Sequence, residues 1–174
     1  MFLAIRLLAS GFGLGYTPIL SGTLGTLLGV PIFWALARLN VGFYFLTLLA
    51  FTALSIFVSD RALSLSLYKD NKKEGDPSQI VIDEVAGFLW AAGIVRYAGF
   101  WKPSEGFFWL VVIPFVFFRI LDASKWWIVG RVERRYHGGI GIVLDDVAAG
   151  ILAGFLSILF CIVYPLIATL IPLL

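Results

Sequence analysis

The chain has 174 residues, of which 60% are hydrophobic and only 14% are charged, and its mean hydropathy is +0.97. This composition excludes an ordinary soluble domain, whose apolar share is about 45–50%. A formal net charge of only +2, without a basic run among exposed aromatic residues, argues against a nucleic-acid partner. The single cysteine, Cys161, excludes a disulfide framework within the chain. We therefore expect an integral membrane protein.

The first apolar run, Met1–Ala9, is too short to cross a bilayer and lacks the small-residue cleavage site of a secretory signal. A stretch rich in glycine and hydroxyl groups, Gly11–Thr26, follows it. A dinucleotide-binding interpretation of its glycines fails because no strand precedes them. Irregular backbone is tolerated at membrane depth only where it is buried in protein or lines a wet cavity. We therefore predict an interfacial or re-entrant N-terminal segment that lines a polar site.

Five later stretches approach or exceed the roughly 17–25 residues that a helix needs to cross the hydrocarbon core. We predict a single all-α membrane domain, residues 1–174, built as a bundle of about five transmembrane helices. Small residues at helical spacing predict close contacts between these helices, as in Gly22, Gly25 and Gly29 and in Gly150 and Gly154. The predicted spans are Thr23–Leu39, Val41–Ser59, Val85–Trp101, Gly106–Leu121 and Val147–Leu174.

The charged residues indicate how the chain is threaded. If each predicted span crosses once, ten of the 13 Lys and Arg residues fall on one side, and the positive-inside rule makes that side cytoplasmic. Of the 11 acidic residues, all except Glu105 fall on the same side, although they were not used to draw the spans. Acids at the ends of the apolar segments can therefore converge on one face. The ten basic residues are Arg6, Arg61, Lys69, Lys72, Lys73, Arg119, Lys125, Arg131, Arg134 and Arg135.

Three acidic motifs lie where apolar segments end: Ile82–Val85, Arg119–Asp122 and Leu144–Val147. Carboxylates at such borders cost free energy unless they are paired or bind a cation, and helix capping or solvation of the membrane border is the alternative role. Adjacent acids on a helix diverge by about 100°, so one can face a metal while the other faces a partner. Oxygen ligands with a single histidine in the chain favour Mg²⁺ over Zn²⁺. We predict Asp83, Glu84, Asp122, Asp145 and Asp146 as metal ligands, and all of these except Glu84 as catalytic residues.

Arg119, Asp122 and Lys125 recur at a spacing of three and therefore lie along one side of a helix. The guanidinium and the ammonium can bind a phosphate while the carboxylate holds a metal that bridges to it. The alternative is a salt bridge between residues i and i+3 at a helix end. Because an idle arginine is costly at the end of an apolar run, we predict that Arg119 and Lys125 bind phosphate.

The stretch His137–Gly141 precedes the third acidic motif and holds three glycines in four residues. Such glycines let backbone N–H groups approach an anion closely, although most glycine-rich turns are only turns. His137 is the sole histidine and is suited to proton transfer. We predict that Gly138 and Gly139 bind the phosphate and that His137 is catalytic, protonating the leaving oxygen.

Five motifs follow one another in order along nearly the whole chain: Gly13–Pro18, Gly22–Gly25, Ile82–Gly87, Phe118–Asp122 with Lys125, and His137–Gly150. This ordered set resembles the bacterial phosphatidylglycerophosphatase A family. The resemblance implies a multi-pass, Mg²⁺-dependent phosphatase of the inner membrane. It would remove the terminal phosphate of phosphatidylglycerophosphate, giving phosphatidylglycerol and phosphate, at a site on the cytoplasmic side.

The chain departs from the family pattern at two places. Where family members commonly carry Pro-Gly-Thr and Lys-Pro-Trp-Pro, this chain has Ser21-Gly22-Thr23 and Lys125-Trp126-Trp127-Ile128. The missing prolines shape backbone rather than supply chemistry, so they affect the local loop path and the head-group preference. The acidic, arginine, lysine and histidine positions of the motifs are all present.

The expected reaction is in-line attack of water on phosphorus, with attack by an aspartate as a second route. The lipid tails would lie along an apolar groove between helices. A small membrane transporter for a cation or phosphate is the rival function, because acids inside a membrane also line ion pathways. An active site needs its acids collected on one face, whereas a pathway does not. The sequence leaves the oligomeric state open.

Overall fold

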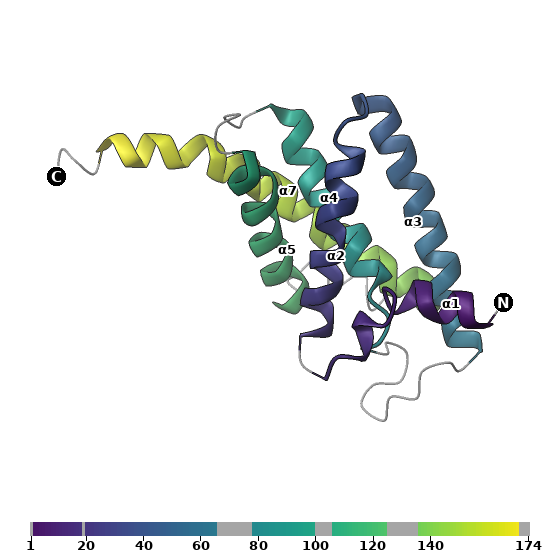
Figure 1. The fold of residues 1–174 in the computed structure, drawn as a ribbon. Coiled ribbons are helices and arrows are strands. Elements are labelled where there is room, and N and C mark those ends of the chain that lie inside the picture. The colour runs from purple at the N-terminus through teal and green to yellow at the C-terminus, as the bar shows by residue number, and fades with distance from the viewer. Residues whose placement is uncertain (1, 19, 66–77, 100–105, 125–135, 171–174) are drawn as a thin grey trace.

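The computed structural model describes residues 2–18, 20–65, 78–99, 106–124 and 136–170. Within these ranges the regular structure is helical throughout and contains no strand, which confirms the all-α prediction. Each predicted span has a helical counterpart (Figure 1). The counterparts are α2 (Ser21–Leu36), α3 (Val41–Ser64), α4 (Ile82–Ala98), the turn η3 (Phe108–Val112) that continues into α5 (Ile113–Ser124), and α7 (Gly138–Leu170).

Two of these helices are long and apolar enough to cross a membrane by length and composition: α3, and α7 over Gly138–Pro165. Helix α2 is apolar but has only 16 residues, and α4 has 17 with two acids in its first turn. The structure therefore gives two candidate membrane-spanning helices. The predicted crossing of about five helices stays a proposal.

Helix α4 packs against α2, α3, α5 and α7 (Figure 1). Small side chains permit this close approach, because a helix without bulky residues lets its neighbours' backbones come near. At Gly93 the ring of Tyr44 from α3 lies directly over the backbone, and its hydroxyl donates to the carbonyl of Leu89 at 2.7 Å. From α2, Gly29 faces Phe88 so closely that an added Cβ would lie 2.8 Å from the ring. The glycine pattern thus marks helix contacts, as the sequence predicted.

The N-terminal segment consists of α1 (Phe2–Ala9) and the 3₁₀ turn η1 (Leu14–Tyr16). Helix α1 packs against α3 (Figure 1) and buries Ile5 and Ala9. The backbone N–H of Val81, just before α4, donates to the carbonyl of Ala9 at 2.8 Å. This bond fixes the N-terminal segment beside the start of α4.

The turn η3 is π-helical, and its cause is Pro114. Proline lacks an N–H, and its ring clashes with the carbonyl four residues earlier. The wider turn accommodates the ring, and the N–H of Ile113 donates instead to the carbonyl of Phe108, five residues back. Because a π turn contains one extra residue, it also sets which face of α5 points toward α4.

Candidate active site

Two glycines form the contact that brings the acidic motifs of α4 and α7 together. The backbone of Gly150 lies directly on the carbonyl oxygen of Gly87, and a Cβ added at Gly87 would lie 2.7 Å from the carbonyl oxygen of Asp146. Asp83 and Asp146 each precede one of these glycines by four residues, so each shares a helix face with its glycine. The close contact of the two backbones therefore carries the two carboxylates toward each other.

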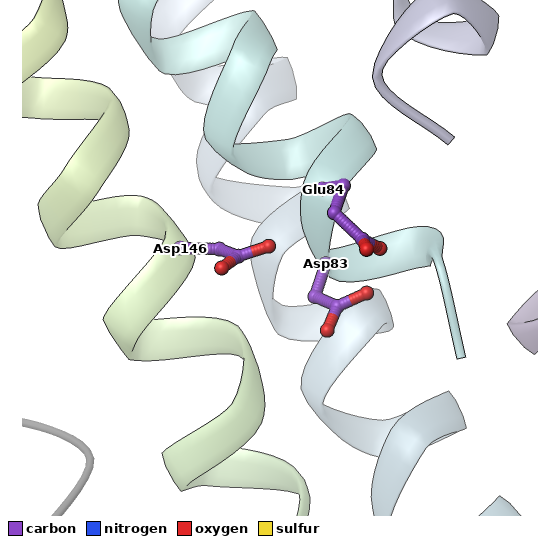
Figure 2. Close-up of side chains that lie close together, drawn as sticks. All are labelled: Asp83, Glu84 and Asp146. Carbon is purple, nitrogen blue, oxygen red and sulfur yellow. The ribbon is translucent and has the colours of Figure 1, made fainter. Parts of the chain in front are cut away.

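Asp83, Glu84 and Asp146 form a group of three carboxylates, called here the carboxylate cluster. Figure 2 shows Asp83 and Glu84 on adjacent positions of α4, with Asp146 extending toward them from α7. One oxygen from each residue lies within 4.8 Å of the other two. Asp83 is only 5% exposed and Asp146 only 4%. Like charges this close and this far from water cannot all stay ionised without a compensating positive charge.

The cluster fits a divalent cation. Its ligand atoms are all carboxylate oxygens, the type that Mg²⁺ and Ca²⁺ prefer. Oε2 of Glu84 is buried and has no hydrogen-bond partner among the described residues, so it has a lone pair available for a ligand. The nearby Asp146 and Asp122 carboxylates repel a negative charge on Glu84. A bound cation would relieve that repulsion.

Arg119 and Asp122 lie on α5 beside the cluster. Nη1 of Arg119 donates to Oδ2 of Asp122 at 2.8 Å, which is the salt bridge between residues i and i+3 that the sequence offered as an alternative. The charges of both residues also act on the Glu84 carboxyl. Arg119 is partly buried, with 24% of its side chain exposed. A guanidinium is thus held next to the three carboxylates, where it can meet an anion that the cation also attracts.

Gly22, in the first turn of α2, lies against both Glu84 and Arg119. A Cβ added at Gly22 would lie 2.6 Å from Oε1 of Glu84 and 3.0 Å from Nη2 of Arg119. The sequence placed this glycine in a helix contact and in a segment predicted to line a polar site. It did not indicate which side chains the glycine faces.

Asp145 has a different environment from its neighbour Asp146. It is 3% exposed, and its Oδ1 accepts a hydrogen bond from the backbone N–H of Asp146 at 3.0 Å. It is not one of the three residues in the carboxylate cluster. Its predicted roles as a ligand and in catalysis stay predictions.

The predicted phosphate-binding glycines lie against α3 near the start of α7. Gly139 packs on the backbone of α3 at Ile56 and Asp60, and Gly138 has a positive φ of 70°. His137 is exposed and precedes the helix. Along α7, Gly139 lies seven residues before Asp146, which is about 10 Å of helix. The structure does not bring these residues into the cluster, so their roles stay predictions. Lys125 lies outside the described residues.

These features define a class of protein: a helical membrane protein with a site suited to a cation and a phosphate group. The sequence model of the phosphatidylglycerophosphatase A family matches residues 7–161. The chain belongs to this family, as its motifs indicated, and is a lipid phosphatase. The family is named for the dephosphorylation of phosphatidylglycerophosphate. The rival interpretation as a transporter is not favoured by this match.

Two relatives illustrate the similarity. A phosphatidylglycerophosphatase A of Escherichia coli is 33% identical over 149 residues, which cover 85% of this chain and 78% of that protein. A protein of Bacteroides thetaiotaomicron provisionally named a phosphatidylinositol-3-phosphatase is 33% identical over 152 residues, which cover 83% of this chain and 86% of that protein. No solved structure matches the chain significantly.

Proposed function

We propose that the chain removes the terminal phosphate of phosphatidylglycerophosphate at the carboxylate cluster, with Mg²⁺ as the cation. The observation that carries this proposal is the position of three carboxylates, the buried Asp83 and Asp146 and the half-buried Glu84, within 4.8 Å of one another and beside Arg119. Both named substrate classes among the relatives are phosphate monoesters of membrane lipids. A cation and a guanidinium together match the charge of such a group.

Asp83, Glu84 and Asp146 would hold the cation, with Asp122 and Asp145 as further candidates. When bound, the cation would polarise the phosphoryl oxygens and make water a stronger nucleophile. The carboxylates would keep it at the border of the apolar bundle, where few other groups can compensate its charge. The buried Oε2 of Glu84 supports this assignment.

Arg119 would bind the phosphate oxygens that the cation leaves exposed, and Lys125 would add a second positive charge. The salt bridge from Asp122 holds Arg119 in one orientation, so less side-chain entropy is lost when phosphate binds. Gly138 and Gly139 remain candidates for backbone contacts to the phosphate. In the reaction the oxygen of water bonds to phosphorus, and the bond from phosphorus to the glycerol oxygen breaks. The glycerol oxygen then takes a proton, for which His137 is the candidate donor.

We further propose that α2, α3, α4, η3 with α5, and α7 all cross the bacterial inner membrane. The segment before α2, the loop before α4 and the segment before α7 would then lie on the cytoplasmic side. Ten of the 13 basic residues support this orientation. The carboxylate cluster would face the cytoplasm, where it can meet a lipid head group at the membrane surface.

The test is phosphate release by purified protein in detergent micelles that contain phosphatidylglycerophosphate. We expect turnover with Mg²⁺, none after EDTA, and recovery when Mg²⁺ is added back. A parallel reaction with phosphatidylinositol-3-phosphate compares the two named substrate classes. Turnover that EDTA does not change would refute the cation, and turnover of the second lipid alone would refute the proposed head group. Ion flux in vesicles with no phosphate release would refute the phosphatase.

The nucleophile is tested by acid quenching during a single turnover. Attack by water leaves the label of a ³²P-labelled substrate in free phosphate at every time point. A transient ³²P-labelled protein that Asp146→Asn abolishes would instead identify the aspartate route.

A further inference from the structure

The end of the bundle opposite the carboxylate cluster carries a cavity. Helices α2 and α4 both begin beside the cluster, with Gly22 and Glu84 in their first turns, and both run away from it. Their other ends lie about 24 Å away by helix length. There, a cavity of about 490 Å³ opens between the ends of α2 and α4 and the start of η3. Trp34, Arg38, Arg96, Phe107 and Leu110 are among its lining residues.

The lining of this cavity is amphipathic. Arg38 and Arg96 supply two guanidinium groups, and Arg96 lies 5.3 Å from the centroid of the Tyr97 ring. Trp34 and Phe107 are large apolar residues that remain 40% and 60% exposed. An arginine near a helix C-terminus is favourable by itself, which accounts for each cation separately. It does not account for two of them sharing a cavity of ligand size with exposed aromatic walls.

We propose that this cavity binds an anionic phospholipid of the leaflet opposite the carboxylate cluster. The lipid phosphate would lie between Arg38 and Arg96, and the upper part of an acyl chain would pack on Trp34, Phe107 and Leu110. A basic pocket between helices is a recognised setting for such head groups. A zwitterionic lipid fits less well, because its ammonium group would be repelled by the two arginines. The leaflet assignment rests on the proposed crossing of the membrane, whereas the binding site does not.

Native mass spectrometry of delipidated protein tests the proposal. Phosphatidylglycerol or phosphatidylcholine of the same acyl chains is added back, and the first bound lipid is quantified. We expect tighter retention of phosphatidylglycerol, with a preference that falls about five-fold for each arginine replaced in Arg38→Gln and Arg96→Gln. The charge-preserving double variant Arg38→Lys with Arg96→Lys should keep most of the preference.

The matched control is Arg61→Gln, which removes an exposed arginine from the C-terminal part of α3 and should leave the preference unchanged. Lipid bound at the carboxylate cluster contributes equally to all of these variants and cancels in the comparison. Equal retention of the two lipids, or a preference that survives loss of both arginines, would overturn the proposal. So would displacement of the lipid by millimolar inorganic phosphate, because the cavity would then be a simple anion site. Each readout is independent of phosphate release, so the proposal can fail while the phosphatase function stands.

Discussion

The acidic pairs of α4 and α7 resemble each other in sequence but occupy different electrostatic settings. Asp83 and Glu84 lie in the first turn of α4, where unpaired backbone N–H groups favour negative charge. Asp145 and Asp146 lie about two turns inside α7, where no such groups are available. Both aspartates of α7 are nonetheless almost completely buried. The position in the first turn of a helix favours the charges of the first pair but not those of the second. The α7 pair therefore carries more weight for a cation site.

The largest expected effect comes from Asp146→Asn, which removes the charge of the one α7 residue in the carboxylate cluster. We expect the turnover number with saturating Mg²⁺ to fall on the order of 10³-fold, because the cation loses a ligand. The yield of folded protein should stay near normal, since asparagine has the same shape. Phosphate release and detergent thermal stability measure the two effects. Arg61→Gln, which removes the charge of an exposed residue on α3, is the control. Loss of folded protein would make Asp146 structural.

The second-largest effect is expected at the contact between Gly87 and Gly150, which brings the acidic pairs of α4 and α7 together. In Gly150→Ala the added Cβ would meet the carbonyl oxygen of Gly87, a backbone atom that cannot move aside by a rotamer change. We expect a loss of about 1–3 kcal/mol in the free energy of unfolding. Activity should fall about 100-fold in the protein that remains folded, because Asp146 is displaced from Asp83. In Gly42→Ala the Cβ would make only an ordinary contact, 3.6 Å from Oδ1 of Asn40, so this control should lower neither stability nor activity. A fully active Gly150→Ala would show that this contact does not set the site.

A smaller effect is expected at Gly22, where folding and activity should separate. In Gly22→Ala the Cβ meets the ends of two flexible side chains, Glu84 and Arg119, which can move without disturbing the backbone. We expect thermal stability close to that of the parent and a fall of about ten-fold in kcat/KM, most of it in KM if Arg119 binds phosphate. Equal losses of stability and activity would mean that Gly22 serves only helix packing.

The smallest effect is expected for Asp145→Asn. Asparagine still offers an oxygen to the N–H of Asp146, so the loss is that of a charge from one hydrogen bond, about five-fold in turnover. The Mg²⁺ concentration for half-maximal rate is measured beside it. If Asp145→Asn is as damaging as Asp146→Asn and weakens Mg²⁺ to the same degree, both residues of the α7 pair are ligands and the contrast within that pair disappears.

Much of this architecture could be predicted from the sequence, because hydropathy and glycine spacing report on helices and their contacts directly. The all-helical class followed from the apolar stretches, and the contact near Gly150 followed from its spacing to Gly154. The convergence of acids on one face followed from counting spans. Each of these predictions depends only on local composition, or on whether the number of spans between two segments is odd or even.

Other features depend on helix phase, which composition does not encode. Nothing in the pair Asp145-Asp146 says which residue faces α4, since a rotation of about 100° about the axis of α7 would exchange them. Likewise, the contact of Gly22 with Arg119 requires the ends of two separate helices to meet. The sequence also grouped His137 with the acids; in the structure His137 lies before the start of α7, and its role stays a prediction.

The π turn before Pro114 has a consequence for how insertions and deletions act in this fold. The extra residue of η3 offsets every later position of α5 by about 100°. A chain one residue shorter between Phe108 and Val112 would keep its composition and its apolar length. It would nevertheless rotate Arg119 and Asp122 away from Glu84, leaving the carboxylate cluster without its neighbouring guanidinium. The length of this turn therefore matters for the site as much as the identity of Arg119 does, because either change would remove the guanidinium from the carboxylate cluster.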